Sequence, residues 1–115
     1  MNNEIRQIFA TEEFKTYYDS LPQNIRDKYD YVIQIMKSQK VVNAKFVKNL
    51  DKTDLYEMRI SVGTNEYRTI LFAVDSLSFI ESTKVILLNS FLKKSTKQYK
   101  SEIEKANKLL NEEEV

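Results

Sequence analysis

Residues 55–74 read LYEMRISVGTNEYRTILFAV, and this stretch decides the fold. Residues 55–62 alternate: one face carries Tyr56, Met58, Ile60 and Val62, and the other carries Glu57, Arg59 and Ser61. A period of two residues predicts a half-buried strand. Residues 63–65, Gly-Thr-Asn, supply turn chemistry. Residues 66–74 are apolar on both faces except near Arg68, which predicts a central strand antiparallel to the first.

Upstream of this hairpin, the pattern predicts a short strand and two helices. Residues 4–9 are expected to form the strand, and Thr11 is the expected N-cap of the first helix. The apolar stripe of that helix is Phe14, Tyr17, Tyr18 and Leu21, and that of the second is Ile25, Tyr29, Val32, Ile33 and Met36. Pro22 separates the two helices, which indicates an antiparallel helical hairpin. Residues 37–54 lack a clean period and are expected to be loop with a short extended piece.

Downstream, Lys84–Phe91 predicts a third long strand, and a capping box of Ser101 and Glu104 predicts the start of a C-terminal helix. The fold class is therefore α+β: an N-terminal strand and a two-helix hairpin packed on a twisted antiparallel sheet, with a C-terminal helix. The 115 residues are too few for two independent cores, so we expect one domain over residues 1–115, with an acidic tail at about 111–115.

The composition excludes several classes of function. The chain has no cysteine and no histidine, so disulfides, thiolate or imidazole metal sites and serine–histidine catalysis are excluded. Since no carboxylate cluster is evident either, we expect no metal and no other cofactor. There is no apolar run of about 20 residues and no apolar signal core, so we expect no membrane association and a cytoplasmic location.

Positive charge is concentrated in two blocks. Residues 36–52 carry five lysines and one aspartate, and residues 84–108 carry seven lysines and two glutamates, whereas the whole chain has a net charge of +1. Phosphate affinity depends on local rather than net charge, so the blocks are candidate RNA-binding surfaces. They could equally be solvated surface, and composition does not choose between these interpretations.

Three sets of residues could act on RNA. They are Lys45, Lys48 and Lys52 before the hairpin; Arg59 and Arg68 within it; and Lys93, Lys94 and Lys97 with Tyr99 after the third long strand. In an antiparallel meander the end of the third strand lies near the start of the second. The last basic group could therefore converge with Arg68 around one site.

Such a cluster suits RNA cleavage, because a 2′-hydroxyl can attack its own phosphate and fixed cations stabilise the charge that develops. A structural interpretation competes at each position. A buried Arg68 could only pair with Glu57 or Glu66, and Arg59 is better explained structurally. Of the four tyrosines in the helical hairpin, we interpret Tyr17, Tyr18 and Tyr29 as core aromatics rather than base-stacking platforms.

The hairpin, together with Val85–Lys94 (VILLNSFLKK) and Ile103–Ala106 (IEKA), resembles the HigB-like, phage-derived branch of the RelE/ParE toxin superfamily. The last strand of that branch carries a Phe-x-Lys-Lys signature, matched here by Phe91 to Lys94. Because the N-terminal strand and helices also fit, the resemblance covers nearly the whole chain.

The resemblance implies a toxin of a type II toxin–antitoxin system, an endoribonuclease that cleaves messenger RNA at the ribosome and is restrained by a cognate antitoxin, expected to be a helix-turn-helix protein. Arg68 matches the family's phosphate-binding arginine, and Lys93 and Lys94 match functional positions at the strand end. Lys48 and Lys52 fall where other members place basic or histidine residues. Without histidine, the chemistry must rely on lysine and arginine.

Two alternatives remain at this point. A ParE-like toxin would have the same fold and inhibit DNA gyrase by binding it, without cleaving RNA. A non-catalytic RNA-binding or interaction module would need only the basic surface. Fold does not decide among these functions.

Overall fold

The computed structural model describes residues 3–113 and places the hairpin at the centre of one sheet. β3 (Leu55–Val62) and β4 (Asn65–Ala73) pair antiparallel across a turn at Gly63 and Thr64. Gly63 has φ +61°, a left-handed conformation that glycine adopts without strain. The central position predicted for the second strand of the hairpin is confirmed.

The sheet has five strands in the order β1-β5-β4-β3-β2. β5 (Lys84–Lys93) pairs antiparallel with β4, and the short β2 (Val47–Asn49) pairs antiparallel with β3. The predicted fold class is confirmed, with one addition. β1 (Gln7–Ala10) joins the sheet parallel to β5, a pairing that requires a long intervening connection.

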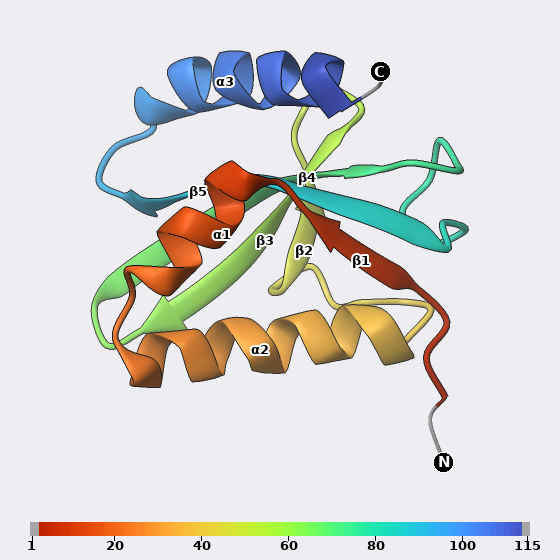
Figure 1. The fold of residues 1–115 in the computed structure, drawn as a ribbon, viewed down its shortest axis with the longest axis horizontal. Coiled ribbons are helices and arrows are strands. Elements are labelled where there is room, and N and C mark those ends of the chain that lie inside the picture. The colour runs from red at the N-terminus through yellow and green to blue at the C-terminus, as the bar shows by residue number, and fades with distance from the viewer. Residues whose placement is uncertain (1–2, 114–115) are drawn as a thin grey trace.

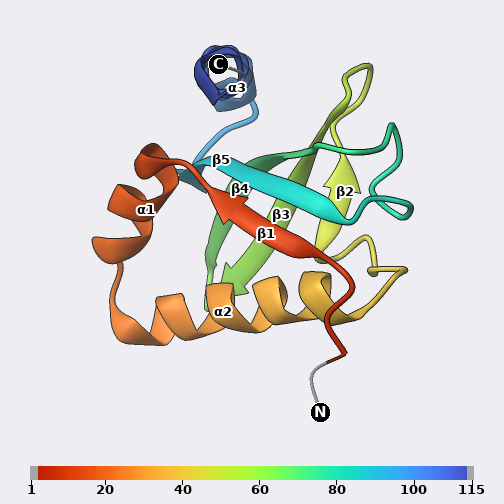
Figure 2. The ribbon, with the colours of Figure 1, turned by 45° about the vertical axis from the view of Figure 1, so that its right-hand side comes forward.

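The two N-terminal helices cover one face of the sheet (Figures 1 and 2). α1 (Glu12–Asp19) begins after Thr11, whose Oγ1 accepts a hydrogen bond from the backbone N–H of Phe14 at 3.1 Å, so the predicted N-cap is confirmed. α2 (Gln23–Ser38) begins after Pro22. The wholly buried Tyr29 ring packs against Phe14, Tyr18 and Tyr67, which confirms its predicted place in the core.

The third helix, α3 (Gln98–Glu113), lies on the opposite face, where Ala106 packs against Leu88 and Phe91 (Figure 1). The predicted capping box at Ser101 is wrong. The helix starts three residues earlier, at Gln98, whose side-chain oxygen accepts hydrogen bonds from the backbone N–H groups of Lys94 and Ser95.

α3 also includes the first three residues of the predicted acidic tail, and positions 114–115 lie outside the described residues. Ser101, now inside the helix, donates a hydrogen bond from Oγ to the carbonyl of Gln98 at 3.1 Å. Between residues 3 and 113, no helix has the length and apolarity needed to cross a membrane.

A single buried arginine ties the N-terminal segment to two distant parts of the chain. Arg6 is 2% exposed, and its guanidinium lies 4.2 Å from the centroid of the Phe79 ring. Its nitrogens donate to Met36 O, Gln39 O, Lys40 O, Phe79 O, Ile80 O and Ser82 Oγ. Burial lowers the pKa of this guanidinium, and the surrounding acceptors replace the water that it has lost.

We predict that Arg6→Ala lowers the free energy of unfolding by more than about 3 kcal/mol, because several buried carbonyls lose their donor at once. Arg6→Lys should lose less, since an ammonium retains three donors. Urea unfolding measures both, with Lys15→Ala on the exposed face of α1 as a control expected to change stability by less than about 0.5 kcal/mol. If Arg6→Ala has the same free energy of unfolding as the wild type, these hydrogen bonds contribute nothing to stability.

Candidate functional site

The strand register gathers charged residues on the sheet face that α3 partly covers, referred to below as the α3 face. Arg59 lies opposite Arg68, and Arg68 opposite Phe91. In the next row Ser61 lies opposite Glu66, and Glu66 opposite Lys93; on the other side Lys48 lies opposite Glu57. Residues directly opposite on antiparallel strands share a face, so these cations and carboxylates are neighbours.

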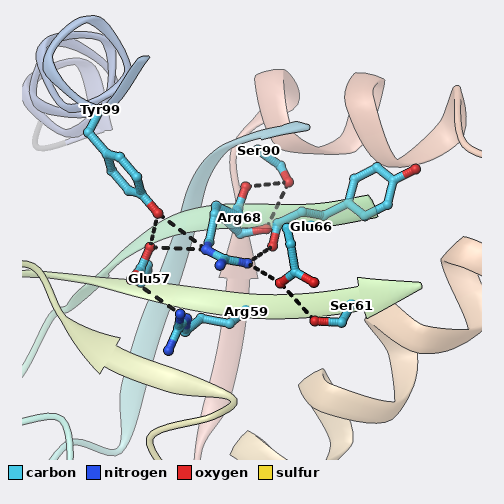
Figure 3. Close-up of polar contacts among 9 residues, drawn as sticks. Glu57, Arg59, Ser61, Glu66, Arg68, Ser90 and Tyr99 are labelled. Carbon is cyan, nitrogen blue, oxygen red and sulfur yellow. Dashed lines mark hydrogen bonds and ion pairs between the residues drawn. The ribbon is translucent and has the colours of Figure 1, made fainter. Parts of the chain in front are cut away.

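Arg68 lies at the centre of this group and is 3% exposed (Figure 3). Its Nη1 donates to Glu66 Oε1 at 3.2 Å and to the carbonyl of Tyr67 at 3.0 Å. Its Nε donates to Tyr99 Oη at 3.2 Å and lies 3.5 Å from Glu57 Oε1. Arg68 therefore pairs with both of the glutamates that the sequence offered as alternatives.

Glu57 is the buried partner, with a side chain 8% exposed. Tyr99 reaches down from the first turn of α3 and donates from Oη to Glu57 Oε1 at 2.6 Å. The other carboxylate oxygen of Glu57 lies 3.8 Å from Arg59 Nε, beyond hydrogen-bond distance. One carboxylate thus contacts β4 and α3 and holds Arg68 and Tyr99 in place.

The protonation states follow from these contacts. Burial, and next the hydrogen bond to Glu57, raise the pKa of Tyr99 to about 12, so the phenol is neutral at physiological pH. The hydrogen bond from Ser61, and next that from Arg68, lower the pKa of Glu66, which is ionised at neutral pH. Unlike Glu57, Glu66 has a side chain 41% exposed, so its bond to Arg68 faces solvent.

The structure brings some of the predicted site residues to Arg68. Lys93 is the last residue of β5, and its Nζ lies 5.8 Å from the centroid of the Tyr99 ring. Lys48 is exposed on β2 across from Glu57. Lys94 and Lys97 are exposed in the segment between β5 and α3. Lys93 therefore lies near Arg68, as expected from the meander, whereas Lys48 is two strands away from it and Lys94 and Lys97 follow the end of β5.

Two predicted residues lie elsewhere. Lys52 is in the turn before β3, with φ +63°, three residues before Leu55. The partner of Leu55 is Phe72, four residues beyond Arg68 on β4 and so roughly 13 Å away along the strand. Lys45 precedes β2, and its Nζ lies 4.9 Å from the centroid of the Phe46 ring. Neither lysine is brought to Arg68.

The sequence did not reveal how α3 is attached to the sheet. Tyr99 was singled out for RNA binding, but its bonds to Glu57 and Arg68 join positions far apart in sequence. Asn89 on β5 donates to Glu102, and Lys105 forms a 2.8 Å ion pair with Glu13 of α1. No local pattern could have indicated these partners.

The arrangement carries more positive than negative charge. Lys48, Arg59, Arg68 and Lys93 provide four cations against the two carboxylates of Glu57 and Glu66. Over residues 3–113 no group of three or more metal-ligating side chains converges. Guanidinium and ammonium groups at this density stabilise negative charge on phosphate oxygens.

A five-stranded sheet covered by a helical hairpin on one face and one helix on the other is a RelE-type fold. A mutant of the E. coli toxin RelE in the free state is similar, with a TM-score of 0.60 and 14% sequence identity over 84% of this chain and 92% of that chain. Residues 16–111 match the family described as phage derived protein Gp49-like, and the chain belongs to that family. No curated protein matches it.

We predict that Tyr99→Phe lowers the free energy of unfolding by roughly 1.5–3 kcal/mol at pH 7–8, the range for hydrogen bonds to charged groups. Because folding raises the pKa of Tyr99 from 10 to about 12, its contribution is complete below about pH 10 and is lost as the pH rises through 12. The difference in free energy of unfolding between wild type and variant, measured with urea, should therefore shrink as the pH rises from 10 to 12. Tyr31→Phe is the control, and a difference independent of pH would contradict the assignment.

Proposed function

We propose that this chain is the toxin of a type II toxin–antitoxin system and that it cleaves messenger RNA without a metal. The observation that carries the proposal is the cationic α3 face, with Arg68 held by Glu57 and Tyr99 and flanked by Lys93 and Lys48. Membership of a phage-derived family and a fold similar to that of a protein named as a toxin support it.

In the proposed reaction the 2′-hydroxyl attacks the adjacent phosphorus while the bond to the 5′-oxygen breaks. The products carry a 2′,3′-cyclic phosphate and a 5′-hydroxyl. Arg68 stabilises the phosphorane-like charge, since a guanidinium can bind two oxygens at once. Lys93, Lys94 and Lys48 surround the phosphate. One lysine, as a neutral amine, accepts the 2′-hydroxyl proton, and another, as an ammonium, stabilises the leaving 5′-oxygen and donates a proton to it.

Arg68 is buried, so the phosphate must replace one of its present partners. Glu66 is the partner that can leave, because its side chain is 41% exposed and contacts Arg68 at 3.2 Å. Glu57 and Tyr99 would remain in place behind the guanidinium and fix its orientation. The incoming phosphate thus exchanges one anion for another at a preformed site.

We place the protein in the HigB-like branch of the RelE/ParE toxins, acting in the cytoplasm on ribosome-bound messenger RNA. Lys45, Lys52, Lys97 and Tyr99 would contribute to RNA binding around the site. A cognate antitoxin, which we propose is a helix-turn-helix protein, would neutralise the cationic face.

One observation favours a different function for the same fold. Arg68 is fully buried between carboxylates in the free chain, as a structural arginine would be. A ParE-like toxin that binds gyrase, or an RNA-binding module without catalysis, would need no such exchange of partners. The outcome of cleavage assays separates these functions.

We predict that the Lys93→Ala/Lys94→Ala double variant loses about 10²–10³ in cleavage rate, as do comparable sites that lose a charge-stabilising group. Growth arrest should disappear with it. The assay is cleavage of ribosome-bound messenger RNA with EDTA present. Lys108→Ala, exposed on α3, is the control.

Arg68→Ala should have the same effect, but it also leaves the buried Glu57 without its cation, so its folding must be verified by urea unfolding. Glu66→Gln should keep activity, because it weakens only the contact that phosphate would replace. Intact messenger RNA together with inhibited gyrase would establish the ParE-like alternative. Full toxicity of folded Arg68 and lysine variants would place the site elsewhere.

We predict that the native operon yields two proteins in a stable complex. An acidic or apolar segment of the antitoxin should cover the face around Lys93 and Lys94, because the cationic face needs neutralising in the cell. Co-purification followed by protection of the lysines from acetylation measures this. Recovery of the chain alone, harmless when overexpressed, would contradict it.

A further inference from the structure

A cavity of about 210 Å³ lies between α2 and the outer edge of β3, at the border of the α3 face. Its lining includes Lys28 and Tyr31 from α2, Lys45 and Phe46 from the segment before β2, and Arg59 and Ser61 from β3. The helix and strand that form its walls lie next to each other in Figure 2.

The cavity exists because β2 is short. β2 pairs with β3 only through Val47–Asn49, and the backbone N–H of Arg59 bonds to the carbonyl of Phe46 at 2.7 Å where the chain turns away. Within residues 3–113, no strand pairs with this edge of β3 beyond that point. The edge of β3 at Arg59–Ser61 therefore has no neighbouring strand on the side of α2.

The chemistry of this lining suits a nucleic-acid base beside a phosphate. Lys28, Lys45 and Arg59 are cations, and none of the described residues that line the cavity is acidic. Tyr31 is 59% exposed, in contrast to the buried Tyr29, and its ring lies edge-on to Phe46 with centroids 6.1 Å apart. An exposed aromatic ring among cations is the usual platform for stacking a base of single-stranded RNA.

We propose that this cavity binds one RNA base, stacked on Tyr31, with its phosphate held by Lys28, Lys45 or Arg59. The volume is below the ~300–1,000 Å³ of pockets that take drug-sized ligands, so its size suits a single base. The nearby surface of α2 at Asn24, Asp27, Lys28 and Tyr31 is also hollowed, which leaves room for the attached ribose.

Arg59 connects the cavity to the cationic face. It lies opposite Arg68 in the register, and its Nε makes no hydrogen bond to any described residue although the atom is buried. A base stacked on Tyr31 would therefore belong to a nucleotide near the scissile phosphate, and the site would add affinity or base preference. This assignment rests on the proposed function, since it takes the bound strand to be the RNA that is cleaved.

The first test is binding alone and requires no cleavage. Amide resonances of the labelled chain are followed by NMR as each of the four nucleoside 5′-monophosphates is added, with ribose 5-phosphate as the matched probe that lacks a base. We expect shifts at Lys28, Tyr31, Phe46 and Arg59 and at least about 5-fold weaker binding of ribose 5-phosphate. Tyr31→Ala should remove this difference, Tyr31→Phe should keep it, and Lys108→Ala should change nothing.

If ribose 5-phosphate binds as tightly as the nucleotides, the cavity binds only an anion. If no resonance shifts, the lysines of the cavity are solvated surface. Either result overturns the inference.

The second test uses RNA cleavage, where Tyr31→Ala should raise KM by about 5- to 100-fold and leave kcat unchanged. A base-dependent shift in a chain that cleaves nothing would refute the proposed function and support the cavity. RNA cleavage by the wild type together with an unchanged KM in Tyr31→Ala would support the proposed function and refute the cavity inference.

Discussion

The buried pairing of Arg68 with Glu57 is the constraint on which the rest of the α3 face depends. Two ionised groups out of water are tolerated only when each is paired and hydrogen-bonded, and here Tyr99 Oη and the carbonyl of Tyr67 supply the remaining partners. The pair joins β3 to β4, and Tyr99 joins both strands to α3. Losing any one member would leave a buried charge or phenol without its partner.

The same contacts explain why α3 lies where it does. Its apolar contact with the sheet centres on the wholly buried Ala106, and polar bonds complete the attachment at Tyr99, Glu102 and Lys105. The helix therefore covers only part of its face. Arg59, Glu66, Lys48 and Lys93 remain at the border between protein and solvent, where a phosphate could reach them.

Without histidine, any acid–base step in this protein would fall to lysine, arginine, tyrosine, hydroxyl or carboxylate groups. The structure provides a guanidinium whose orientation is determined by residues on three elements, and lysines that approach it from β2 and β5. In the reaction that we propose, a substrate anion would take the place of Glu66, whose side chain is 41% exposed. A site of this kind is preorganised for negative charge. Because one anion would replace another, the buried guanidinium would keep an anionic partner throughout the exchange.

Local periodicity in the sequence was enough to predict β3, β4, the Thr11 cap and the core role of Tyr29, because each depends on a few neighbouring residues. The composition alone ruled out imidazole and thiol chemistry. Only the tertiary structure decided the parallel direction of β1, the start of α3 at Gln98, the separation of Lys52 from Arg68 and the cavity that joins Tyr31 to Arg59. The pairing of β1 and the position of Lys52 depend on strand register, and the cavity is lined by Tyr31 and Arg59, which are 28 positions apart, so no short window of sequence contains both partners.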